Sequence, residues 1–132
     1  MQYDPSVITA VAESAASSLK IGQRLPPQIV LRAADSTPIE IQDMCMSDTR
    51  FKIIVFTGDM ADPPQRQLLD SFVHKVITGS GLFKRYGSKA FDFITVIKGD
   101  KATVDYLQVP TALRFDYHKH VSSCLIPVFP LL

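Results

Sequence analysis

The chain has 132 residues, of which 46% are hydrophobic and 20% charged, and its formal net charge is +1 at pH 7. This length allows one domain with a sizeable core. The balanced charge and the lack of a basic block argue against a nucleic-acid-binding protein. No apolar run approaches the roughly 20 residues that span a bilayer, so a membrane partner is not expected.

The N-terminal segment carries charges at Asp4 and Glu13, where a secretory signal peptide would be uncharged. We therefore expect a cytoplasmic protein. Residues 4–6 (DPS) are a helix-start signal, because proline is tolerated in the first turn. Residues 7–19 are rich in alanine and serine and predict a weak helix, or a linker that enters the domain.

The next segments predict strands. Residues 28–32 and 39–41 read as two short strands, and the polar turn at residues 35–38 joins them into a hairpin. Residues 52–57 form a continuous β-branched and aromatic run. That run is the pattern of a strand covered on both faces.

A helix and a further strand follow. Residues 63–78 carry apolar side chains at helical spacing, begin after the capping residue Asp62 and end at the glycines of residues 79–81. Residues 91–97 then predict a second buried strand. Two strands joined by a helical crossover of this length indicate a parallel unit, so the expected fold class is α/β. Residues 103–107 predict one more short helix.

The histidines are weak candidates for a functional site. His118 and His120 bracket one lysine, and Cys124 follows four residues later, a pattern that some metal sites use. No carboxylate or second cysteine cluster completes a ligand set, so we favour solvated histidines and expect no metal. His74 lies on the predicted helix, and as a general base it would need a nucleophile that the sequence does not nominate.

The segment after the predicted helix offers no better site. Lys84, Arg85 and Lys89 surround Tyr86 in a small basic group, which we interpret as part of a solvated loop. Residues 79–81 (GSG) are too short and isolated to be a phosphate loop, and no GxGxxG follows a strand. The sequence therefore assigns no catalytic, cofactor-binding or metal-binding residue.

Several short motifs spread along the chain carry a family resemblance. They are residues 3–6 (YDPS), 21–26 (IGQRLP), 32–38 (RAADSTP), 55–58 (VFTG), 109–110 (VP), 114–115 (RF) and 116–119 (DYHK). From residue 1 to about residue 119 the chain resembles the C-terminal domain of fungal phenol 2-monooxygenases and related flavin-dependent aromatic hydroxylases. The resemblance implies a thioredoxin-like fold, a central mixed sheet flanked by helices, and a role in subunit dimerisation.

The same resemblance implies that this chain is not itself an enzyme. Flavin binding, NADPH use and phenol hydroxylation belong to two upstream domains of that family, and their motifs are not present here. The expected partners are a second copy of the chain or the flavoprotein domains. The opening segments also resemble peroxiredoxins, but their reactive cysteine would fall in residues 58–64 (GDMADPP), where this chain has none.

The resemblance divides the chain into a helix or linker (residues 1–20), a thioredoxin-like domain (21–119) and a divergent apolar tail (120–132). Family members continue past residue 119 with further strands, so we expect the final strands to be lacking. The dipeptide at residues 121–122 can be encoded as a splice donor, which makes the tail either translated intron or a genuine end. In both cases we expect an unpaired sheet edge, marginal stability and self-association.

Two other functions stay open at this point. The two cysteines, Cys45 and Cys124, lie far apart and form no CxxC pair, which fits unpaired thiols in a reducing compartment. A relic of a thiol peroxidase or oxidoreductase would need one of them at a helix N-terminus or beside a cation. Alternatively, a stand-alone accessory protein would use its aromatic side chains to bind an aromatic compound or to dock on a separate oxygenase.

Overall fold

The chain divides into two compact units, and each is described by itself. The computed structural model describes residues 20–79, 81–98, 106–114 and 120–123. The smaller unit consists of Met1–Pro27 with Ile126–Leu132, and the larger is Gln28–Leu125. In the smaller unit the Gln23 N–H donates to the Lys20 carbonyl at 3.1 Å and closes a turn. The helix predicted at residues 7–19 lies outside the described residues.

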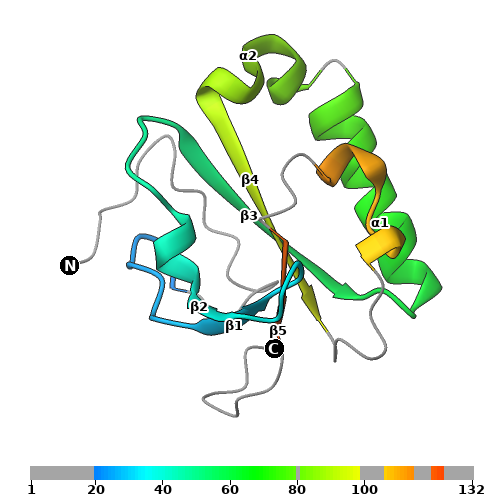
Figure 1. The fold of residues 1–132 in the computed structure, drawn as a ribbon. Helices are drawn as coiled ribbons and strands as arrows, with labels where there is room; N and C mark the ends of the chain where they lie inside the picture. Colours follow the sequence, from blue (N-terminus) through cyan, green and yellow to red (C-terminus); the bar gives the residue numbers. More distant parts are fainter. Residues whose placement is uncertain (1–19, 80, 99–105, 115–119, 124–132) are drawn as a thin grey trace. The chain divides into compact units, whose positions relative to one another are not determined.

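In the larger unit three β-strands precede two α-helices, and two more strands follow the helices (Figure 1). In chain order they are β1 (Ile29–Arg32), β2 (Pro38–Glu40), β3 (Phe51–Asp59), α1 (Pro63–Val73), α2 (Leu82–Ala90), β4 (Phe91–Lys98) and β5 (His120–Ser123). Short helical turns lie at Ile41–Met44, Tyr106–Gln108 and Thr111–Leu113. Within the described ranges, no helix combines the length and the apolar character needed to traverse a bilayer.

The strands form one sheet in the order β2-β1-β5-β4-β3. β1 runs antiparallel to β2 and to β5, whereas β4 runs parallel to β3 and to β5. The hairpin expected around residues 35–38 is confirmed. The parallel unit of strand, helix and strand is confirmed in β3, α1 and β4, and with it the α/β class.

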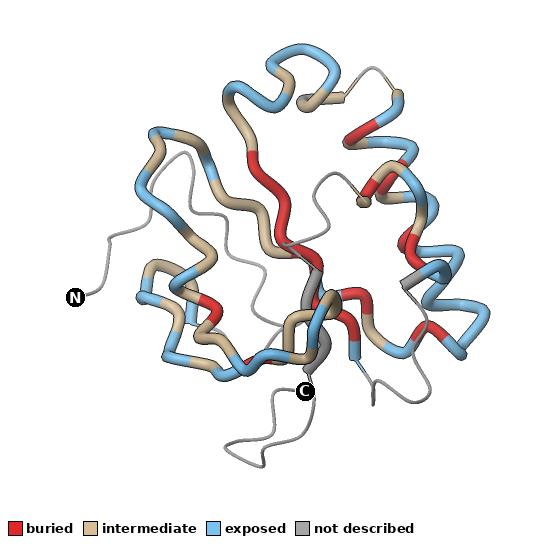
Figure 2. Tube along the Cα trace, in the orientation of Figure 1, coloured by how far each residue is buried: buried red, intermediate tan, exposed pale blue. Residues whose placement is uncertain are grey.

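β4 is the most buried strand of the sheet. Residues 92–97 are all buried, which Figure 2 shows as a continuous buried stretch through the centre of the fold. Because successive side chains of a strand point to opposite faces, this uninterrupted burial shows that both faces of β4 are covered. The main hydrophobic cluster packs between this part of the sheet and α1, and comprises Val55, Met60, Leu69, Val73, Ile77, Phe93, Ile97, Val109 and Leu113.

The helix predicted at residues 63–78 is confirmed, with a change of geometry near its end. α1 starts with two prolines in its first turn and continues as the π-helical segment His74–Thr78. The Gly79 N–H then donates to the His74 carbonyl at 2.7 Å. At Gly81 a β-carbon would lie only 2.2 Å from the Lys75 carbonyl oxygen. The close approach of these two backbone segments therefore requires glycine.

Two elements escape the sequence analysis. The basic residues 84–89 belong to α2, so the loop predicted there is wrong, although these residues are exposed as expected. Phe83 anchors α2 by an edge-on contact with Phe93, with ring centroids 5.4 Å apart. β5 lies in the segment read as a divergent tail, yet it pairs with both β1 and β4 in the middle of the sheet.

β3 differs from its prediction in its surroundings. The strand is present, but it is the terminal strand of the sheet formed by the described residues. Phe51 is 67% exposed and Phe56 41% exposed, so the expected cover on both faces is wrong. A β-branched run predicts an extended backbone. It carries no information about which elements cover the faces of the strand or pair with its edges.

Truncation of Leu113 tests whether the helical turn Thr111–Leu113 belongs to the core. Leu113 is 1% exposed and lies in the hydrophobic cluster, so Leu113→Ala should lower the free energy of unfolding by about 2–5 kcal/mol. Leu107→Ala is the matched control, because Leu107 is 66% exposed and its truncation should change that energy by less than about 0.5 kcal/mol. Equal urea midpoints for the two variants would contradict this packing.

Candidate functional site

The loop after β3 is where a reactive cysteine would stand in peroxiredoxin-like proteins. Here the backbone turns at Gly58, with a φ of 69°, in an irregular stretch where the β3–β4 register shifts. The Arg66 guanidinium donates to the carbonyl of the buried Met60 at 2.6 and 3.2 Å. The Ala61 N–H donates to the Asp59 carboxylate at 2.9 Å. These contacts hold the loop closed and give it a structural role.

Cys45 is not an activated thiol. It ends the turn Ile41–Met44, and its Sγ donates to the Ile41 carbonyl at 3.6 Å. Burial raises the pKa of the Cys45 thiol, and the nearby Lys52 ammonium offsets that effect only in part. A raised pKa keeps the thiol protonated, whereas nucleophilic cysteines have lowered values. Cys124, the other thiol of the alternative hypothesis, lies outside the described residues.

The histidines singled out by sequence do not share one element. His74 is exposed on the π-helical segment, far along the chain from His120 at the start of β5. His118 lies outside the described residues. Among the side chains that the structure describes, no three histidine, cysteine, aspartate or glutamate residues are grouped to hold a metal ion.

A charged cluster at the start of β3 was missed by sequence. The Lys52 ammonium donates to the Asp48 and Asp92 carboxylates at 2.7 and 2.8 Å, and the Arg50 guanidinium forms ion pairs with both carboxylates. Lys52 and Asp92 are also direct register partners of β3 and β4. Asp92 is buried and Asp48 half-buried, so the cluster ties the two strands together at one end.

The cluster shifts the pKa values of its members. Hydrogen bonds from Arg50, and then from Lys52, hold the pKa of the Asp48 carboxyl far below its usual range. Burial alone would lower the pKa of Lys52, but its hydrogen bonds to Asp48 and Asp92 outweigh burial and the pKa is raised. Both shifts keep the groups charged at neutral pH.

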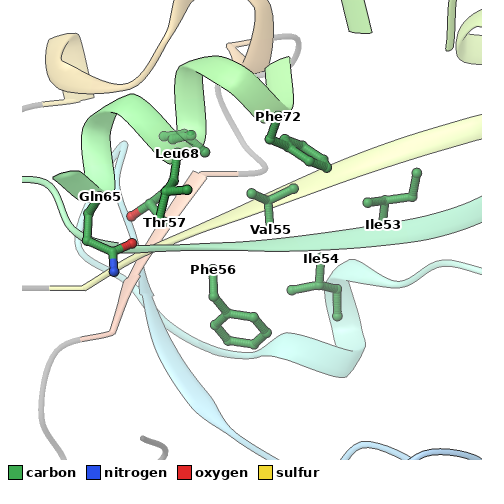
Figure 3. Close-up of a pocket in the computed structure, with 9 residues that line it drawn as sticks. Ile53, Ile54, Val55, Phe56, Thr57, Gln65, Leu68 and Phe72 are labelled. Atoms are coloured by element: carbon green, nitrogen blue, oxygen red, sulfur yellow. The ribbon is translucent and has the colours of Figure 1, made fainter. Parts of the chain in front are cut away.

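The edge of β3 that faces away from β4 has no described neighbour. It borders an apolar groove of about 330 Å³. Its wall on the strand is formed by the five successive residues Ile53, Ile54, Val55, Phe56 and Thr57. Neighbouring side chains of a strand point to opposite faces. In Figure 3, Val55 and Thr57 point toward α1, whereas Ile54 and Phe56 point away from it. A groove lined by both sets runs along the edge of the strand itself.

The other wall of the groove belongs to α1. Its lining residues are Gln65, Leu68 and Phe72, which Figure 3 labels, and Leu69. Leu68 is 64% exposed. Thr57 and Gln65 provide the polar side chains of this lining, and the remainder is apolar. Exposed apolar surface beside a strand edge with no described neighbour is typical of an interaction site.

Comparisons with known proteins identify similar sequences. Residues 1–127 match the family described as phenol hydroxylase, C-terminal dimerisation domain. This match extends beyond residue 119 and includes β5. The chain is 28% identical over 119 residues to the FAD-dependent monooxygenase terD of Aspergillus terreus, and 26% identical over 129 residues to the phenol 2-monooxygenase fsqG of Aspergillus fumigatus.

The two matches cover most of this chain but only a small part of each relative. They cover 83% and 86% of this chain but only 19% and 20% of the respective relatives. The chain therefore spans about a fifth of the length of the curated relatives that it matches.

The charged cluster predicts a specific loss of stability in acid. The folded-state pKa of Asp48 lies below its unfolded value of about 3.9, so its contribution is complete above that value and is lost as pH falls below it. The urea midpoint should therefore drop as the pH falls from about 5 to about 2, and Asp48→Asn should reduce this drop. Asp43→Asn, at an exposed carboxylate, is the control. An unchanged pH dependence in Asp48→Asn would contradict this role of the cluster.

Proposed function

Because the chain belongs to the family of phenol hydroxylase C-terminal dimerisation domains, we propose that it is a non-catalytic domain that makes a subunit contact. Its partner is a second copy of the chain or the flavoprotein domains of a monooxygenase. The observation that carries this proposal is the apolar groove along the edge of β3 that has no neighbour among the described strands. An apolar groove beside free backbone groups suits association better than catalysis.

The arrangement of the larger unit supports a thioredoxin-like fold as part of this proposal. Its parallel β3–α1–β4 unit packs one helix against two adjacent strands, and the β1–β2 hairpin lies at the opposite side of the sheet. We propose a shortened form of the family fold, because the open edge of β3 offers a position for further strands. We also place the protein in the cytosol, where a free thiol such as that of Cys45 persists.

FAD and NADPH would be bound by other domains of a complete monooxygenase. Among the described residues, Gly81 does not fit a dinucleotide, because it follows a helix instead of a strand and the Lys75 and Val76 carbonyl oxygens lie close to it. A phosphate site needs backbone N–H groups at that place. We therefore assign no step of hydroxylation to this chain.

Self-association of the purified chain tests the proposal. Sedimentation equilibrium should show a reversible monomer–dimer equilibrium that depends on protein concentration. The same material should neither consume peroxide nor oxidise phenol, since the Cys45 thiol is held protonated by its burial.

Two results would refute this function. The first is a chain that stays monomeric at every concentration and does not bind a flavin monooxygenase lacking this domain. The second is turnover of peroxide, a disulfide or a phenol by the isolated chain.

A further inference from the structure

The edge of β3 that faces away from β4 has no neighbour among the described strands, and its middle part lacks the features that usually protect such edges. Edge strands are commonly short, or carry prolines, bulges and charges that prevent another strand from pairing. β3 is nine residues long, and its stretch from Ile53 to Thr57 contains neither proline nor charge. The charged cluster lies before this stretch and the irregular turn at Gly58 after it. The regular part between them can accept a strand.

We propose that a second copy of the chain occupies this edge, with its own β3 paired antiparallel and Ile54 opposite Ile54. The two sheets then become one continuous sheet through both copies. This inference rests on the proposed function, because it specifies how the subunit contact is made. Antiparallel pairing of a strand with itself places the twofold axis normal to the sheet, so a residue faces only partners of its own parity.

This register pairs side chains of compatible chemistry. On the face covered by α1, Ile53 lies opposite Val55, and Phe51 opposite Thr57. On the other face, Lys52 lies opposite Phe56, whose ring packs against the lysine methylenes. The pairs formed by residues 52–56 use the regular stretch of β3, and Thr57 lies where the register against β4 begins to shift. Both α1 helices lie on the same face, so the exposed Leu68 of each copy extends the apolar cover over the joined strands.

The charges at the two ends of β3 favour the antiparallel direction. Arg50 and Lys52 lie at the beginning of the strand, and Asp59 and Asp62 lie at and beyond its end. Arg50 and Lys52 already pair with Asp48 and Asp92 of their own chain, so antiparallel pairing brings the acidic end of one copy beside a charge-balanced cluster of the other. A parallel pair would instead set Asp59 against Asp59, and like charges directly opposite each other are destabilising.

A second copy fits this groove better than a foreign peptide does. The pairing is self-complementary, and it satisfies the free backbone groups of both chains at once. The family is that of a dimerisation domain, which agrees with a copy of the same chain as partner. A contact of one strand pair and two helix flanks is small, so we expect a reversible dimer.

Two variants test the pairing in the full chain. Phe56→Lys places a charge in the joined sheet and should weaken dimerisation about tenfold or more, the loss typical of a central interface residue. Ile29→Lys is the matched control, because Ile29 is also an exposed apolar strand residue but lies on β1, three strands from β3 in the sheet order. It should leave the dimer unchanged. Circular dichroism checks that both variants remain folded.

A cysteine cross-link decides the register independently of that comparison. In a background with Cys45→Ser and Cys124→Ser, Ile54→Cys should form a disulfide between copies under mild oxidation. Directly opposed residues of antiparallel strands have Cα atoms about 4.5–5.5 Å apart, within the range that a disulfide spans. Ile29→Cys in the same background should not cross-link.

The outcomes separate this inference from the proposed function. An associating chain in which Ile54→Cys fails to cross-link overturns the strand pairing, whatever Phe56→Lys does, and leaves the subunit-contact function standing. A dimer as strong in Phe56→Lys as in the wild type also overturns the pairing. A wild-type chain that remains monomeric and binds no monooxygenase overturns both.

Discussion

Backbone hydrogen bonding at β3 is the constraint on which the rest of the structure depends. Every N–H and C=O group of a strand must find a partner or water, and β3 has β4 on one side but no described strand on the other. Water can satisfy those groups, but it cannot cover Phe51, Phe56 and Leu68. Association is favourable because it buries these side chains and at the same time pairs the backbone groups of the β3 edge.

The two ends of β3 hold this edge in position. At its beginning, Lys52 bridges Asp48 and Asp92 and fixes the register against β4. At its end, Gly58 turns the chain, and Arg66 ties α1 to the Met60 carbonyl. The strand between these anchors is therefore ordered before any partner arrives, which reduces the entropy lost on association. The same anchors leave no reactive group at the place where related folds carry a cysteine.

The parts of this fold that depend on neighbouring residues could be predicted from sequence, and those that depend on distant ones could not. The β1–β2 hairpin and α1 follow from a turn signal and from helical periodicity. β5 has only four residues, and its stability comes from pairing with β1 and β4, which are distant in sequence. The Lys52–Asp92 ion pair joins residues 40 positions apart. The basic side chains of α2 suggested a solvated loop, because the contact of Phe83 with Phe93 that holds this helix on the sheet is tertiary and cannot be read from the segment itself.

Hydrogen–deuterium exchange across a range of protein concentrations tests the central claim most directly. If the free edge of β3 makes the subunit contact, the amides of β3 that point away from β4 exchange quickly in dilute protein and become protected as the concentration rises. Amides of α2 and of the β1–β2 hairpin should change little. Protection that rises on those elements while β3 remains unchanged would place the contact elsewhere and contradict this account.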